Sequence, residues 1–320
     1  MKSRMLVALI TALAFASAAA AQDYPNRLIK LMHGFPPGGN VDVVARLLAQ
    51  EMAKGLGQTI VVEGKPGQAG SLAAEAIAGA EPDGYTLLLV VGAHPATAAV
   101  YRKLKYRPVD DFAWISTAAF YPFVVCVRKD SAWKDFSDLV QAARAKPGGV
   151  TSGTAGLGSI AHMTTELIGA MAGVKLMAVP YRGEAPAMTG LLSGDINFVV
   201  ATSTLAAPHV RSGEVRGLGL TGKTRWKDFP DIPTLAESGL PELEVISWSG
   251  LAAPANTPKP IVDRIHAELQ RTIAVPEVRA RLESFGAEVR GTTPAQMRAL
   301  VERQLALWTK VAQAANIQLD

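Results

Sequence analysis

The sequence predicts an α/β protein of two domains, each a mostly parallel sheet flanked by helices. Three observations lead to this fold class. Short apolar runs alternate with helix-period segments over residues 28–91, and the same alternation begins again near residue 123. About 300 residues are enough for two domains with ordinary hydrophobic cores. Because strand–helix–strand units connect by right-handed crossovers, neighbouring strands should run parallel.

The first set of elements begins with the apolar run at 28–35, which the turn PPGGN (36–40) ends. The apolar positions that follow have the spacing of one helix face: Val41, Val44, Ala45, Leu48 and Met52. The rest of this set is a strand at 59–64, an Ala-rich helix at 72–80 and a buried strand at 85–91. This order predicts one parallel sheet covered on both faces.

The second set begins with the strand FVVCVR (123–128) and a capped helix within 130–146. After the Gly-rich stretch 150–159, the expected elements are a helix from Ile160 to Met171, a strand at 175–181, a helix at 184–192, and strands at 196–200 and 215–220. The proline-rich residues 225–241 hold no long element. A strand at 246–254 and two helices, at about 258–273 and 294–315, close the chain.

The N-terminus has the pattern of a secretory signal peptide. A basic start, a short apolar run and Ala19-Ala20-Ala21 predict a leader over residues 1–21 that is cleaved near Ala21. A membrane anchor is the alternative, but the apolar run is short for a span, which needs about 20 residues. The single cysteine, Cys126, excludes an internal disulfide and a lipid-bearing cysteine at the cleavage point. We therefore expect export to a bacterial periplasm and no membrane-spanning segment after cleavage.

Charge argues against nucleic acid as a partner. Without Lys2 and Arg4, the formal net charge falls from +4 to +2, because 4 − 2 = 2. The remaining basic and acidic residues are interspersed, with no basic block of the kind that follows a phosphate backbone.

The stretch GLGLTGKT (217–224) matches both the ATP-binding phosphate loop and the dinucleotide fingerprint. Either motif must open a helix, whose N-terminal N–H groups hold the phosphates. Here Pro230 and Pro233 follow too closely for a long helix. The sequence therefore predicts a strand and a turn, and no nucleotide or other cofactor.

Three other Gly-rich turns each lie between a predicted strand and a predicted helix: PPGGN (36–40), SGTAGLGS (152–159) and YRGEAP (181–186). Free N–H groups and the positive end of a helix suit an anion, and ligands of open α/β sheets bind at this edge. Gly is also the default residue of a tight turn, so each turn alone has a plain structural explanation. Three in matching positions favour a carboxylate site.

Five side chains near these turns are candidates for a structural role, a ligand contact or both. Ser159 is a candidate N-cap, and Asp42 lies where it would cap the first helix rather than meet an anion. Arg182 could pair with a ligand carboxylate or be a solvated surface arginine. His94, like His162, is a candidate wall group at the same edge rather than a general base, since no paired nucleophile is evident.

Catalysis and metal binding find no support in the sequence. There is no G-x-S-x-G elbow, and the five histidines show no metal-ligand spacing. The sequence thus predicts a protein that is not an enzyme and holds no metal.

On these motifs the chain resembles the Bug family, the TctC-like periplasmic substrate-binding proteins of tripartite tricarboxylate transporters. The matching segments span essentially the mature chain and include HGFPPGGNVDVVARLLA, VVEGKPGQAGSLAAEAIAGAEPDGYTLL, TSGTAGLGSIAHM, VPYRGEAPAMTGLLSGDINF and WSGLAAPANTP. The resemblance implies a two-lobed Venus-flytrap protein (type II) with two chain crossings. Lobe one would be residues 22–122 plus 222–320, and lobe two residues 123–221.

The resemblance also implies which residues bind the ligand. The carried-over set is Pro37, Gly38, Gly39, Asn40, Asp42, Ala93, His94, Thr154, Ala155, Gly156, Ser159, Tyr181, Arg182, Gly183 and Ala185. The chain has HGFPP where many members have a VPFAP-like run, and Asn40 where Ser is common. The first turn therefore departs from the family pattern.

The expected function is capture of a small di- or tricarboxylate, or a related organic acid, by a monomer. The protein would deliver this ligand to the membrane permease subunits of a tripartite tricarboxylate transporter. A ligand-sensing receptor without transport and a secreted enzyme on the same frame are the alternatives.

Overall fold

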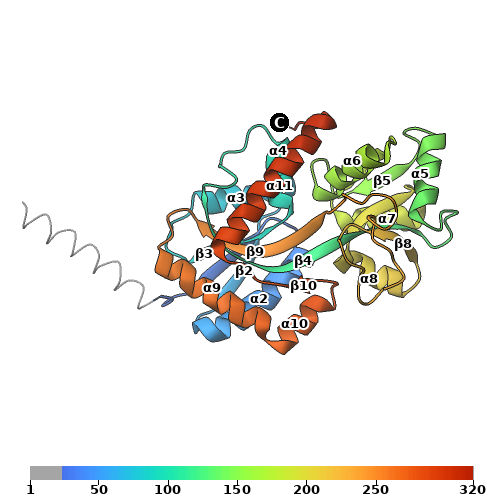
Figure 1. The fold of residues 1–320 in the computed structure, drawn as a ribbon. Helices are drawn as coiled ribbons and strands as arrows, with labels where there is room; N and C mark the ends of the chain where they lie inside the picture. The colour runs from blue at the N-terminus through green and yellow to red at the C-terminus, as the bar shows by residue number, and fades with distance from the viewer. Residues whose placement is uncertain (1–23, 320) are drawn as a thin grey trace, which may run out of the picture.

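The computed structural model describes residues 24–319, so the predicted signal peptide lies outside the described residues. Figure 1 shows two groups of helices and strands joined by long strands. The strands are β1 (Ile29–His33), β2 (Ile60–Gly64), β3 (Thr86–Val91), β4 (Phe112–Arg128), β5 (Thr151–Thr154), β6 (Met177–Pro180), β7 (Phe198–Thr202), β8 (Val215–Leu220), β9 (Ile246–Pro254) and β10 (Glu288–Val289). The helices are α2 (Asn40–Leu56), η1 (Gln68–Gly70), α3 (Ser71–Ala78), α4 (Ala93–Val100), α5 (Phe136–Ala145), α6 (Ile160–Ala172), α7 (Glu184–Ser193), α8 (Ser203–Arg211), α9 (Lys259–Ala274), α10 (Pro276–Glu283) and α11 (Pro294–Ala314).

The strand β4 belongs to two sheets, which it joins. Its first part pairs with β9 as far as Pro122, opposite Ile246, and its second part pairs with β7 from Phe123, opposite Thr202. The first sheet has the order β2-β1-β3-β9-β4, and β10 also pairs with β4. The second sheet consists of β4, β7, β5 and β6 in that order, with β8 on the other side of β4.

Both sheets are mixed. The three strands β2, β1 and β3 are parallel, as are β6, β5 and β7, whereas β9 runs antiparallel to β3 and β4. In the second sheet, β7 and β8 both run antiparallel to β4. The predicted parallel pairing thus holds within each strand–helix–strand set. The strands that carry the chain between the sheets add the antiparallel part.

The strand directions place the carboxyl ends of the two parallel sets opposite each other. Because β3 and β4 are both antiparallel to β9, β1 and β3 run in the direction of β4, toward the second sheet. Because β7 is antiparallel to β4, the set β5, β6 and β7 runs back toward the first sheet. The carboxyl edges of the two parallel sets therefore face each other across the β4 crossing, where open α/β sheets bind ligands.

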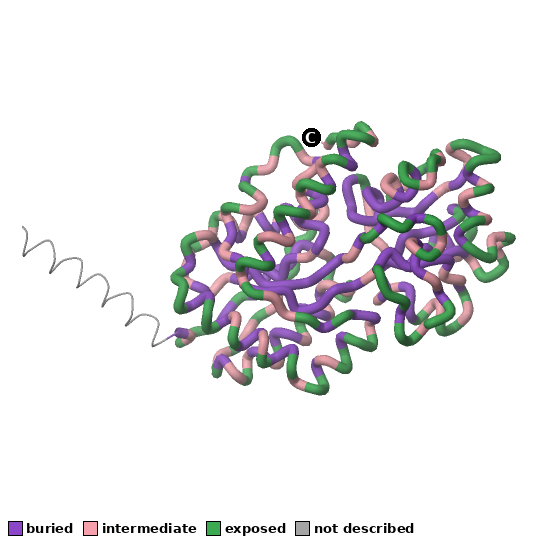
Figure 2. Tube along the Cα trace, viewed as in Figure 1, coloured by how far each residue is buried: buried purple, intermediate pink, exposed green. Residues whose placement is uncertain are grey.

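Helices cover both faces of each sheet. On the first sheet, α2, α9 and α10 pack on one face around Leu48 and Leu269, and α3 and α11 pack on the other around Ile77 and Met297. On the second sheet, α5 and α6 cover one face and α7 and α8 the other. Figure 2 shows the buried residues running along the strands of both sheets. The packing follows from the amphipathic helix faces and the apolar strands.

Two segments cross this simple division. Residues 226–245 follow β8 but pack against the second sheet, where Trp226 and Leu235 are buried. The C-terminal part of α11 also contributes Trp308 to the core cluster that contains Phe123 of the second sheet. The C-terminal helix therefore packs on both groups of elements, and residues 226–245 belong by packing to the second group.

Most predicted elements are present, and six short elements were not predicted. These are the helices η1, α4, α8 and α10 and the strands β5 and β10, which lie in stretches to which the sequence analysis assigned no helix or strand. The strand β4 begins at Phe112, eleven residues before the predicted strand at 123. Among residues 24–319 no helix has the length and apolar character that crossing a membrane requires.

Candidate functional site

The facing edges bring together loops from both sheets. From the first sheet come the turn between β1 and α2 and the loop between β3 and α4. From the second sheet come the turns that lead from β5 to α6, from β6 to α7, and from β7 to α8. The three predicted Gly-rich turns are thus at the carboxyl ends of parallel strands, as the sequence predicted.

Asp42 holds the first turn together. Its Oδ2 accepts hydrogen bonds from the Gly38 N–H at 3.0 Å and from Arg46 Nε at 2.9 Å. Its Oδ1 lies 3.0 Å from His33 Nε2 and accepts from the Arg46 guanidinium at 2.9 Å. The Arg46 bonds, followed by those from Gly38 and His33, lower the pKa of Asp42 to about 2. The carboxylate is saturated, so it has no lone pair left to oppose an incoming anion.

This network changes the role of one predicted residue. The Gly38 N–H is engaged by Asp42 and is not free to donate to a ligand. The N-cap of α2 is Gly39, which forms no side-chain cap bond, so the first N–H groups of the helix lack a side-chain acceptor. Asn40, the first residue of α2, has a buried Oδ1 with no hydrogen-bond partner among the described residues. Donors and an acceptor therefore remain available at Gly39 and Asn40 rather than at Gly38.

The second turn is built around the start of α6. Ser159 is its N-cap, and its hydroxyl accepts from the His162 N–H at 3.3 Å, as predicted. His162 Nδ1 accepts a hydrogen bond from the Gly158 N–H at 3.0 Å, so this histidine stabilises the conformation of the turn. Gly156 has φ +114, a conformation that glycine adopts without strain. The Tyr181 N–H donates to the Thr154 carbonyl at 2.9 Å and joins this turn to the next one.

The third turn contains charged side chains of both signs. Arg182 is exposed and pairs with no carboxylate among residues 24–319. Glu184 begins α7 and is half-buried, and the Thr202 hydroxyl donates to its Oε2 at 2.8 Å. Burial raises the pKa of Glu184, and its bonds to Thr202 oppose this. The sequence analysis did not consider Glu184, whose contact with Thr202 joins the third turn to the end of β7.

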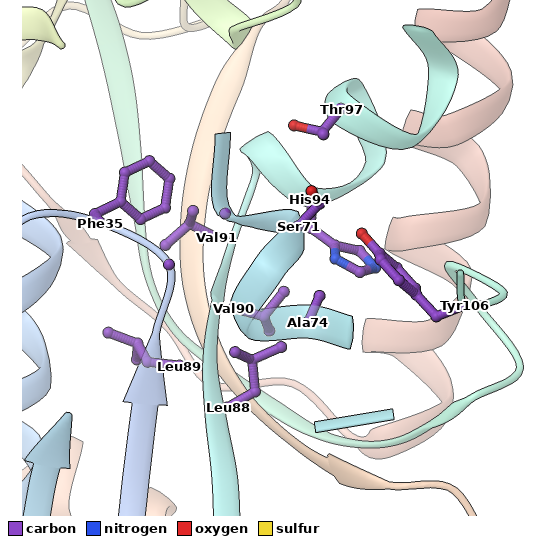
Figure 3. Close-up of a pocket in the computed structure, with 12 residues that line it drawn as sticks. Phe35, Ser71, Ala74, Leu88, Leu89, Val90, Val91, His94, Thr97 and Tyr106 are labelled. Carbon is purple, nitrogen blue, oxygen red and sulfur yellow. The ribbon is translucent and has the colours of Figure 1, made fainter. Parts of the chain in front are cut away.

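His94 lines a small cavity behind the first-sheet edge (Figure 3). The cavity has a volume of about 20 Å³, room for one water molecule, and Tyr106 and Ser71 also line it. His94 Nε2 lies 2.8 Å from the Pro108 carbonyl, and burial lowers the pKa of this histidine to about 4. The imidazole is therefore neutral at ordinary pH, with Nε2 as the donor. It packs against Tyr106, Phe112 and Trp114, so the structure places His94 in an aromatic cluster behind the edge, and its predicted role as a wall of the ligand site stays a prediction.

The nucleotide-motif segment has no role at these edges. Residues 215–220 form β8, and a turn follows where a phosphate loop would open a helix. Lys223 forms an exposed ion pair with Glu244 at 3.0 Å. The described part of the chain also contains no group of three or more His, Cys, Asp or Glu side chains placed to hold a metal ion.

Known proteins identify the family. The model of the TctC family, described as "Tripartite tricarboxylate transporter family receptor", matches residues 44–317, well over half of the chain. The chain belongs to the TctC family. Members of this family, which includes the Bug proteins, are binding proteins and not enzymes.

Three solved TctC-type structures share the whole fold. The periplasmic binding protein BugD is 32% identical with a TM-score of 0.84, covering 92% of this chain and 99% of its own. MatC from Rhodopseudomonas palustris, with bound malate, is 34% identical with a TM-score of 0.82, covering 90% and 99%. Rpa4515 of R. palustris, with adipate, is 34% identical with a TM-score of 0.84, covering 92% and 99%. The chain thus has the α/β periplasmic binding protein fold.

Proposed function

We propose that the protein captures a small carboxylate between two lobes in the periplasm. It then delivers this ligand to the membrane permease subunits of a tripartite tricarboxylate-type transporter. From the sequence we assigned the lobes to residues 22–122 plus 222–320 and to residues 123–221; because residues 226–245 pack on the second sheet, we propose that the second lobe extends to residue 245.

The observation that carries this proposal is the opposition of the two carboxyl edges, each with one helix N-terminus, α2 or α7, that has no side-chain cap. Such groups bind anions without a nearby cation. Two relatives of the same fold and family hold malate and adipate, both dicarboxylates. A dicarboxylate has two anionic ends, which suits a site with helix N-termini on both sides.

We propose that the ligand is held by two groups of residues. The first group, on the first-lobe edge, is Pro37, Gly39, Asn40, Ala93 and His94, with Gly38 and Asp42 shaping the turn. The second, on the second-lobe edge, is Thr154, Ala155, Gly156, Ser159, Tyr181, Arg182, Gly183 and Ala185. Gly156 and Gly183, at φ +114 and +125, hold backbone conformations that side chains rarely adopt.

Closure would be a hinge motion about the two chain crossings. These crossings lie at Pro122–Phe123 in β4 and at Val245–Ile246 before β9, and the two are neighbours because Pro122 pairs with Ile246. A hinge of this kind needs backbone rotation at only a few element-terminal positions.

The test is a thermal-shift screen of residues 22–320 against citrate, C4–C8 dicarboxylates, acidic amino acids, aromatic acids and ATP. A ligand that binds only the native state increases the free energy of unfolding by mass action, by about 2.7 kcal/mol when its concentration is 100 times its Kd. The melting temperature rises as a result. We expect a shift with one class of carboxylate and none with ATP. The absence of a shift with every acid, at millimolar concentration and after refolding to remove trapped ligand, would refute the proposal.

A further inference from the structure

The tail of the chain, residues 315–319, runs back beside α4 after α11 ends (Figure 1). Asn316, at φ +52, turns the chain. The Leu319 N–H then donates to the Val100 carbonyl at 2.8 Å, and the Arg102 N–H donates to the Leu319 carbonyl at 3.0 Å. The tail is therefore fixed by backbone hydrogen bonds to the end of α4, the helix that follows β3 of the first sheet.

The tail also contacts the second Gly-rich turn, which follows β5 of the second sheet. A Cβ built on Gly158 would lie 2.6 Å from Val100 Cγ2 and 2.9 Å from Leu319 Cδ1. Carbon atoms of neighbouring groups pack at about 3.5–4.0 Å, so a side chain at Gly158 would displace both. The turn at the edge of one sheet is thus in direct contact with two side chains that the elements of the other sheet carry.

The second turn has few restraints of its own. Gly156 and Gly158 have φ +114 and +74, and the side chain of Leu157 between them does not anchor the turn, since it is 47% exposed. The hydrogen bonds that the Gly158 and Ser159 N–H groups donate stay within the turn and the first turn of α6. Glycine loses more conformational freedom on folding than any other residue, so ordering this turn is costly. Packing from outside therefore has a large influence on its conformation.

The contact is part of a hydrophobic cluster to which both sheets contribute. The cluster contains Val100 of α4, Trp308 of α11 and Ile160, the first residue of α6. Leu319 is partly buried against it. Because Ile160 directly follows the turn, the cluster fixes the start of α6, and Leu319 extends the same packing to the turn itself.

We infer that the tail positions the second turn for the ligand, with Leu319 as the positioning residue. This inference rests on the proposed function, in which the second turn holds a carboxylate. Leu319 acts through Gly158. With the tail in place the turn keeps one conformation, and without the Leu319 side chain its two glycines sample others. The tail thus orders the turn before a ligand arrives, which reduces the entropy lost on binding.

Hydrogen exchange measured by mass spectrometry tests this on residues 22–320 without any ligand. The substitution Leu319→Ala removes the side chain that meets Gly158 and keeps the backbone bonds of the tail. We expect the N–H groups of residues 156–163 to exchange about tenfold faster than in the wild type, because local opening depends on local contacts. Those of residues 37–45, in the first turn and α2, should be unchanged.

The matched control is Ile317→Ala in the same tail. Ile317 packs against the same cluster but is not among the atoms nearest to Gly158. This variant loses a side chain of the same size, so it reports the effect of weaker packing alone. We expect its melting temperature to fall about as much as that of Leu319→Ala, with the exchange of residues 156–163 close to that of the wild type.

Titration calorimetry with malate and adipate as probes adds the binding readout. We expect a probe that binds the wild type to bind Leu319→Ala about tenfold more weakly, because the turn must then be ordered on binding. The affinity of Ile317→Ala should be unchanged.

The outcomes separate this inference from the proposed function. Exchange of residues 156–163 that is equal in the two variants, or unchanged in Leu319→Ala, would overturn the inference. A faster-exchanging turn with unchanged probe affinity would also overturn it, because the tail would then have a structural role only. Failure of both probes to bind the wild type counts against the proposed function, and the exchange comparison then decides whether the tail orders the turn.

Discussion

Two carboxylates near the facing edges, Asp42 and Glu184, have opposite surroundings. Asp42 receives hydrogen bonds from Gly38 and Arg46 and contacts His33, and its pKa falls to about 2. Glu184 has bonds only from Thr202 and no counter-charge in the described chain, and burial raises its pKa. Both lie at the start of a helix beside a predicted anion-binding turn.

The difference teaches how a binding protein for anions can contain acidic side chains. A saturated carboxylate such as Asp42 is part of the scaffold, because its hydrogen-bonding capacity is spent inside the protein. Glu184 has fewer protein partners, and both of its hydrogen bonds come from Thr202. The first turn is therefore held together by the side chain of Asp42, whereas Glu184 is held by a single residue at the end of β7.

The largest effect should come from Gly34→Ala, which breaks the scaffold of the first turn. A Cβ at Gly34 would collide with backbone atoms of Gly70. Because the colliding atoms are backbone and not the end of a flexible side chain, the clash cannot be relieved by a change of rotamer. We expect a loss of about 3 kcal/mol of stability, since overpacking a tight site costs 1–3 kcal/mol or more. Chemical denaturation measures this.

The matched control is Gly39→Ala, in the same turn. Its Cβ would come no closer than 3.4 Å to the Pro36 carbonyl, and its φ of −74° suits any residue. This variant should unfold within about 0.5 kcal/mol of the wild type. Equal stability of the two variants would show that the first turn is not a tightly fixed scaffold.

The second prediction concerns Asp42→Asn and its pH dependence. The pKa of Asp42 in the folded state, about 2, lies below its ordinary value of 3.8, so its contribution is present above pH 3.8 and is lost as pH falls toward 2. The difference corresponds to at most about 2 kcal/mol, because Arg46 is exposed and solvent screens the pair. The variant should therefore be less stable at pH 7, and the two proteins should converge near pH 2. Parallel stability curves would contradict the assignment.

The sequence predicted the scaffold well where the signal was local. The structure contains the alternating strands and helices, the Gly-rich turns and the Ser159 cap. Each of these features depends on residues that are close together in the sequence. The short helices α4 and α8 were missed because AHPATAAV and STLAAPHVR each contain a proline, which argued against a helix, although Thr202 caps α8 as Ser159 caps α6. Their positions depend on packing against distant elements.

The charges at the facing edges were harder to predict for the same reason. Asp42 was expected to cap the first helix, but it bonds instead to Gly38, Arg46 and His33, and His33 lies nine residues away on β1, so spacing alone cannot match it to Asp42. The surroundings of Glu184 are set by Thr202, which lies eighteen residues later in the chain and pairs with Phe123 at the sheet crossing. Such pairs form only because folding brings distant segments together, so they cannot be predicted from neighbouring residues.

A third prediction tests the helix end of the first turn with Gly39→Val. The added side chain fits the backbone but covers the N-terminal N–H groups of α2 that we propose hold the ligand. We expect stability close to that of the wild type and an affinity about tenfold or more lower for any acid found in the screen, because each charge-assisted bond contributes about 1.5–3 kcal/mol. Titration calorimetry measures the affinity. Unchanged affinity would remove the first turn from the site.

The smallest effect should be the change in ligand-free stability on Glu184→Gln. A carboxyl whose pKa is raised in the folded state holds its proton longer than in the unfolded chain. Its contribution to stability therefore falls as pH rises from 4.5 through the folded pKa. The variant lacks this loss, so its melting temperature relative to the wild type should increase between pH 4 and pH 7. This sign is opposite to that of Asp42→Asn. A variant that is less stable at pH 7 would mean that the charge of Glu184 is already balanced inside the protein, like that of Asp42.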